Sequence, residues 1–151
     1  MLIVMAGLPG AGKSSVAETL GRRLAAPVVS VDPIEAAIWR AGVARDQPTG
    51  LAAYVVAEAV AGGVLALGQT VIADAVNAVE AAREQWRSLA RRHGVPVAFI
   101  EVVCSDPVVH CQRWKAAPAG SMASWNRGGR RWKGCGRSSP RGPITAWCWR
   151  L

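Results

Sequence analysis

The sequence has only four cysteines among 151 residues, and no two of them form a C-x-x-C pair. A disulfide framework needs a set of spaced cysteines in a secreted chain, and a structural zinc site needs closely spaced Cys or His ligands. Neither pattern occurs in the sequence, and no secretory signal is recognisable. We therefore expect a protein of the reducing cytoplasm that depends neither on disulfides nor on zinc.

Long hydrophobic runs are also missing. The uncharged, mainly apolar segment AVAGGVLALG after Glu58 is half as long as the roughly 20 apolar residues of a transmembrane helix. We expect no membrane-spanning segment. A hydrophobic share of 51% in 151 residues is instead enough for one domain with a sizeable core.

Acidic residues are absent from the last 41 residues, which carry nine Lys or Arg. Residues 1–110 hold nine basic and all ten acidic side chains, so their charges sum to −1 and the net charge of +8 belongs to the end of the chain. The last 41 residues also contain five of the seven Trp. We therefore divide the chain into a core, residues 1–113, and a basic tail, residues 114–151.

Hydrophobic patterning in the core predicts strands that alternate with helices. The residues Val16, Leu20 and Leu24 fall on one face of the first helix, as in an amphipathic helix. This alternation predicts a three-layer α/β fold with a mainly parallel sheet, in which ligands bind beyond the carboxyl ends of the strands. The expected strands are residues 2–6, 28–31, 70–73 and 97–103, and the expected helices are residues 13–25, 34–44, 51–67 and 79–93.

Residues 7–14, GLPGAGKS, stand between the first strand and the first helix and match the phosphate-loop pattern G-x-x-x-x-G-K-[ST]. Glycines let consecutive N–H groups converge on phosphate oxygens, and the helix that follows points its positive end at the same place. A turn that only caps the helix is the alternative. We predict that Lys13 reaches the β- and γ-phosphates of ATP and that Ser14 coordinates Mg²⁺. The predicted nucleotide-binding residues are Gly7, Leu8, Pro9, Gly10, Ala11, Gly12, Lys13, Ser14 and Ser15.

Two carboxylates stand at the ends of predicted strands: Asp32 follows VVSV, and Asp74 follows TVIA. Phosphoryl transfer needs one carboxylate for the metal and another to accept the proton of the attacking hydroxyl. We assign Asp74 to the Mg²⁺ shell and Asp32 to the base. In the structural alternative, Asp32 only caps the next helix before Pro33, and Asp74 is only a polar loop residue.

The sequence predicts the roles of three other polar residues less specifically. Asn77 suits a helix cap as well as a substrate contact. Asp106, followed by Pro107, predicts the capped start of another helix. We expect His110 on the surface of that helix, because no second His or Cys stands beside it at metal-ligand spacing.

The core resembles the small P-loop kinases of the adenylate-kinase-like group, bacterial proteins often labelled AAA family ATPases or ATP-binding proteins. The resemblance is carried by GLPGAGKS, by SVD ending at Asp32, by IADAVN around Asp74, and by CSDPVVHCQR ending at Arg113. Relatives include polynucleotide 5′-hydroxyl kinase, chloramphenicol phosphotransferase, gluconate kinase and the zeta toxins.

This resemblance implies a P-loop NTPase fold that binds ATP and Mg²⁺ and transfers the γ-phosphate to a hydroxyl of a small molecule or a nucleotide end. It also implies that Asp32 takes the proton of the acceptor hydroxyl and that Arg113 belongs to a lid that clamps the transferring phosphate. For Arg113, a solvated helix charge is the alternative. For the whole chain, the alternative is a nucleotide-binding ATPase or switch without a phosphoryl acceptor.

The tail departs from the family, whose lid alternates acidic and basic residues. Permitted codons for residues 113–127, read one base earlier, give LEGRTRGFHGFLEP, and the same shift over residues 137–145 gives EFAPWTD; both resemble this family's lid and final helices. We infer a single-base loss just after Arg113, and expect an irregular tail and impaired transfer. A basic, aromatic nucleic-acid-binding segment is the alternative reading of the tail, although we expect no nucleic-acid partner.

Overall fold

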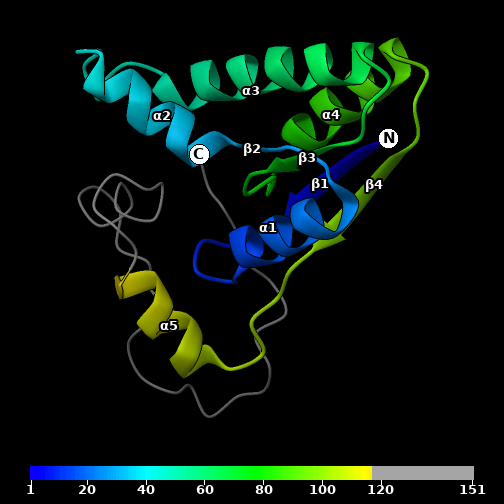
Figure 1. The fold of residues 1–151 in the computed structure, drawn as a ribbon. Helices are drawn as coiled ribbons and strands as arrows, with labels where there is room; N and C mark the ends of the chain where they lie inside the picture. Colours follow the sequence, from blue (N-terminus) through cyan, green and yellow to red (C-terminus); the bar gives the residue numbers. More distant parts are fainter. Residues whose placement is uncertain (117–151) are drawn as a thin grey trace.

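The structure, a computed structural model, describes residues 1–116 (Figure 1). The boundary after Arg113 falls within a helix that continues to Ala116, and the rest of the irregular tail and the inferred change of reading frame concern residues outside this described part. These three statements therefore remain predictions.

Strands and helices alternate along the described chain as the sequence predicts, with boundaries that differ by a few residues. The largest difference is at α2, which begins three residues before the expected start and ends four residues before the expected end. The elements are β1 (Leu2–Ala6), α1 (Lys13–Leu24), β2 (Val28–Ser30), α2 (Val31–Arg40), α3 (Thr49–Ala66), β3 (Val71–Asp74), α4 (Glu80–Arg92), β4 (Val97–Glu101) and α5 (Pro107–Ala116).

The strands form one parallel sheet in the order β2-β3-β1-β4. In the register of the sheet, Val4 of β1 lies between Ala73 of β3 and Phe99 of β4. Every residue of β1 is buried, because α1 covers one face of the sheet while α3 and α4 cover the other (Figure 1). The predicted three-layer α/β fold with a parallel sheet is confirmed.

Two hydrophobic clusters hold these layers together, one on each face of the sheet. The larger cluster joins the sheet to α3 and α4, and the indole of Trp86 is fully buried within it. The smaller cluster packs Ala17 of α1 on Ile3, Met5 and Ile72. All four strands therefore bring their carboxyl ends to one edge of a rigid sheet, where the phosphate loop begins.

The predicted apolar face of α1 is wrong for Val16 and Leu24 but not for Leu20, which packs against the smaller cluster. Val16 and Leu24 are 36% and 51% exposed, whereas the helix turns Ala17 and Gly21 toward the sheet. A Cβ atom on Gly21 would lie 2.8 Å from Cγ2 of Val28. Small residues face the sheet because α1 packs close to it, and of the three large apolar residues only Leu20 packs against the smaller cluster.

The helix α3 is long and apolar enough to cross a membrane, as judged by length and composition alone. Ala53, Ala57 and Ala61 on its inner side are buried against the sheet. Core helices of soluble proteins pass the same test, so this helix is weak evidence for a membrane span. Its outer side is apolar as well, which the sequence analysis did not weigh.

Candidate functional site

The phosphate loop joins the buried end of β1 to the first turn of α1. Gly7, Gly10 and Gly12 adopt φ angles of +130°, +82° and +101°, which side chains with a Cβ disfavour. At Gly7 there is also no space, because a Cβ atom would lie 2.3 Å from the carbonyl oxygen of Val102. The glycines of the predicted motif are thus required by the backbone that the structure shows.

Lys13 is the first residue of α1, where the loop ends, and is only 9% exposed. Its Nζ donates a hydrogen bond of 3.1 Å to the carbonyl oxygen of Leu8. Burial lowers the pKa of Lys13, and the charges of Asp74 and Asp32 oppose that shift only in part. A buried ammonium with incomplete compensation is a favourable partner for an anion. The hydroxyls of the predicted loop that lie exposed at the start of α1 belong to Ser14 and Ser15.

Asp32 lies in the first turn of α2 and is half-buried, so the structural alternative, in which it only caps this helix, is wrong. Ser30 occupies the cap position, and its hydroxyl donates instead to Oδ2 of Asp74 at 3.2 Å. Burial raises the pKa of Asp32; the charge of Lys13 lowers it, and the charges of Asp74 and Glu35 raise it further. The carboxylate is therefore more basic than an exposed aspartate.

Asp74 is the last residue of β3 and is 5% exposed. Its Oδ1 atom is buried and has no hydrogen-bond partner within residues 1–116. Buried carboxylate oxygens are rarely left without a partner, and such an oxygen fits a hard divalent cation. Asp74, together with the Ser14 hydroxyl, would supply the protein ligands of Mg²⁺, whose chemistry is to neutralise charge on phosphate oxygens.

The helix α5 contacts the phosphate loop from the other side. The Nη1 atom of Arg113 lies 3.8 Å from the point that a Cβ atom on Gly12 would occupy, so its guanidinium reaches the loop. His110 is part-buried with its Nε2 atom 2.8 Å from the carbonyl oxygen of Pro9. His110 thus lies on the surface of α5, as predicted, and the contact shows that this surface faces the phosphate loop. Asp106 caps α5 as predicted and accepts two backbone hydrogen bonds.

Asn77 is neither a helix cap nor an exposed substrate contact, the two roles that its sequence position suggested. It is fully buried, with a φ angle of +48°. Its Nδ2 donates to the carbonyl oxygen of Met5 at 2.7 Å, and its Oδ1 accepts from Nε1 of Trp86 at 2.9 Å. Together with the hydrogen bond from Gly7 to Val76, of 3.1 Å, these contacts attach the segment after Asp74 to the start of the phosphate loop.

Tyr54 is a second residue that the sequence reasoning missed. It comes from the second turn of α3, and its hydroxyl accepts a hydrogen bond of 3.3 Å from the backbone N–H of Asn77. Burial raises the pKa of the Tyr54 hydroxyl, and the negative charges of Asp32 and Asp74 act in the same direction. Tyr54 therefore lies near enough to Asp32 and Asp74 for their charges to act on its hydroxyl. Nothing local to its apolar helix signals this role.

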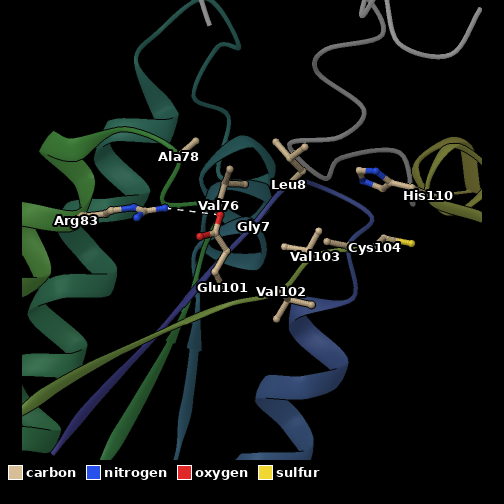
Figure 2. A pocket seen from close by; sticks show the side chains of 11 residues that line it. Gly7, Leu8, Val76, Ala78, Arg83, Glu101, Val102, Val103, Cys104 and His110 are labelled. Carbon is tan, nitrogen blue, oxygen red and sulfur yellow. Dashed lines mark ion pairs between the residues drawn. The ribbon is translucent and has the colours of Figure 1, made fainter. Parts of the chain in front are cut away.

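A cavity of about 310 Å³ opens beside the phosphate loop, between the end of β4 and the segment that follows β3 (Figure 2). At one end of it, Nη2 of Arg83 lies 4.0 Å from Oε1 of Glu101, while Cys104 and His110 lie at the other end. Lys13, Asp32 and Asp74 do not line it. The cavity therefore adjoins the phosphate loop but is not lined by the carboxylates of Asp32 and Asp74.

Comparison with known families and structures supports this reading of the fold. The sequence model of the protein family described as "AAA domain" matches residues 2–121 of this chain. A candidate kinase from Chloroflexus aurantiacus is 22% identical with a TM-score of 0.68; the match covers 79% of this chain and 71% of that one. Kti12 from Chaetomium thermophilum, in complex with ADP-AlF3, is 22% identical with a TM-score of 0.64, over 82% of this chain and 72% of that one.

APS kinase CysC from Mycobacterium tuberculosis, in complex with AMPPNP and APS, is similar over 74% of this chain and 66% of that one, with 20% identity and a TM-score of 0.59. A comparison with curated proteins found no match. The solved structures share the fold at low identity, and the family match spans most of the chain. The chain belongs to the AAA domain family and has the fold of the kinase-like P-loop NTPases.

Proposed function

We propose that this protein is an ATP-binding P-loop kinase that transfers the γ-phosphate of ATP, bound with Mg²⁺, to a hydroxyl of a small molecule or a nucleotide end. The observation that carries the proposal is the gathering of Lys13, Asp32 and Asp74 at the edge where the strands end. These three side chains influence one another's charge, and two of them have shifted pKa values. Shifted values of this kind are typical of catalytic groups.

The loop at Gly7 to Ser14 would bind the triphosphate. Its left-handed glycines leave room for backbone N–H groups to approach phosphate oxygens, and the first turn of α1 adds its positive end. Lys13 would exchange its hydrogen bond to Leu8 for the β- and γ-phosphates. The complexes of Kti12 with ADP-AlF3 and of APS kinase with AMPPNP support nucleotide binding by this fold.

In the transfer step, Asp32 would accept the proton of the acceptor hydroxyl as the oxygen attacks the γ-phosphorus. The new O–P bond forms while the bond to the β-phosphate oxygen breaks, and ADP leaves with that electron pair. A raised pKa suits this role, because a carboxylate that is more basic than usual takes the proton more readily. The guanidinium of Arg113 would stabilise the negative charge on the transferring phosphate.

The proposal is tested by acceptor-dependent ADP release in a screen of hydroxyl compounds, run on this chain and on a version whose reading frame is restored after Arg113. Asp32→Asn should lower transfer by about 10²- to 10⁴-fold while leaving ATP affinity unchanged. Asp46→Asn is the matched control, because Asp46 is exposed in the loop after α2. It should change neither quantity.

Two results would count against the proposal. Equal loss of ATP binding and of transfer in Asp32→Asn would show that Asp32 is structural. ADP release at the same rate with and without every acceptor, in the frame-restored version, would favour the ATPase or switch.

A further inference from the structure

The outer side of α3 is apolar from end to end. We call this surface the outer face of α3; it consists of the exposed residues Leu51, Ala52, Val55, Val56, Ala59, Val60, Gly63, Ala66 and Leu67. The one charged residue of the helix, Glu58, turns toward α4, where it pairs with Arg92 and accepts a hydrogen bond from Gln85. A helix on a protein surface normally carries polar residues on its outer side. This face therefore lacks the composition of a surface in contact with water.

The exposed area is also large. Leu51, Val55 and Val60 are 66%, 55% and 49% exposed, and Leu67, directly after the helix, is 76% exposed. With Val56, these side chains present roughly 500 Å² of apolar surface, near the upper end of what a monomer normally exposes in one patch. Two such faces in contact would bury roughly 1,000 Å², and the flanking alanines would bring the total close to the approximately 1,200 Å² of a specific interface.

Seven of the nine residues of the outer face are spaced symmetrically about Ala59; Val56 and Val60 are the two exceptions. Counted from Ala59, exposed residues recur four, seven and eight positions away in both directions, as the numbering shows. The pairs that lie at equal distance from Ala59 are Val55 with Gly63, Ala52 with Ala66, and Leu51 with Leu67. If two copies of α3 lie antiparallel with a two-fold axis at Ala59, these pairs meet across the interface. A valine then packs against a glycine, which lets the helices approach closely.

We propose that a second copy of this chain covers the outer face of α3, forming a two-fold dimer with antiparallel α3 helices. A membrane surface is a poorer match. Helices that lie on membranes carry Lys and Arg on the side opposite their apolar face, whereas the opposite side of α3 is buried against the sheet and α3 contains neither residue. The helix α1 takes no part in this contact, because it lies on the other face of the sheet (Figure 1).

The oligomeric state of the full chain tests the dimer. In sedimentation equilibrium, the protein should be a dimer, and Val55→Lys should weaken the dimer by about tenfold or more, because it buries an unpaired charge. Leu24→Lys is the matched control, since Leu24 is 51% exposed on α1; it should leave the dimer unchanged. Circular dichroism and urea unfolding of the two variants check that both are folded.

A crosslink gives a second readout that does not require a destabilising change. Ala59→Cys should form a covalent dimer under a mild oxidant, because Ala59 meets its own copy at the two-fold axis. Leu24→Cys should give no more dimer than the native cysteines of the chain. The proposal is overturned by a monomer at about 100 µM, where even weak dimers form. It is equally overturned by a dimer that Val55→Lys leaves intact, or by a monomer that binds vesicles of phosphatidylcholine and phosphatidylglycerol.

Discussion

Replacing Asn77 by alanine should destabilise the protein far more than an ordinary polar substitution. The indole N–H of the fully buried Trp86 would lose its acceptor, which costs about 1–3 kcal/mol. The carbonyl oxygen of Met5 would lose a hydrogen bond of 2.7 Å, which costs about 1 kcal/mol. The φ angle of +48° suits asparagine better than alanine by about 1 kcal/mol. The sum is about 3–5 kcal/mol, a large share of the stability of a domain.

Urea unfolding followed by circular dichroism measures this loss, with the exposed Gln69→Ala as a control that should stay within about 0.5 kcal/mol of the wild type. A double-mutant cycle with Trp86→Phe isolates the contact. Once Asn77 is gone, losing the indole N–H should cost about 1–3 kcal/mol less than it does in the wild type. A loss below about 1 kcal/mol for Asn77→Ala, or additive effects in the cycle, would refute the reasoning.

Three further changes test the phosphate loop and α5. Gly7→Ala should reduce nucleotide affinity more than tenfold in calorimetry, because its Cβ would meet Val102; Gly42→Ala, also at positive φ but with open space around it, should leave affinity intact. Lys13→Met should raise the Tm of the nucleotide-free protein at neutral pH, because burial lowers the pKa of Lys13 in the folded state and so penalises its charged form. The gain in Tm should fade as the pH rises through this folded pKa toward 10.5, where the unfolded chain also loses its charge. A gain that persists at that pH would contradict this reasoning. Asp106→Ala should cost α5 about 1 kcal/mol of local stability, seen as faster amide hydrogen exchange at Val108, and unchanged exchange would show that the cap is dispensable.

The strands and the phosphate loop could be predicted from the sequence because their signals are local. The run Leu2–Ala6 is apolar throughout, as expected of a strand buried on both faces, and the structure has a strand with those bounds. The glycines before Lys13 permit the positive φ angles that the observed loop requires, and the pattern G-x-x-x-x-G-K-[ST] places them at the right positions. In both cases the neighbours in sequence are also the neighbours in space.

Other features depend on contacts between distant segments, and the sequence analysis missed them or misplaced them. The buried side of α1 is lined by Ala17 and Gly21, because the helix lies close to Val28, and no pattern within the helix reveals that distance. The partners of Asn77 lie 72, 23 and 9 residues away along the chain, in β1, α3 and α4. The contact of His110 with the phosphate loop spans 101 residues. Such contacts are set by the packing of whole elements.

Isothermal titration calorimetry of ATP with magnesium, on the full chain and on Lys13→Ala, tests nucleotide binding most directly. Both proteins must first show the same circular dichroism and a cooperative unfolding transition. The account predicts heat of binding for the wild type with one site per chain, and no measurable heat for Lys13→Ala. A folded wild type that gives no heat, or a folded Lys13→Ala that binds ATP with the same affinity, would contradict it.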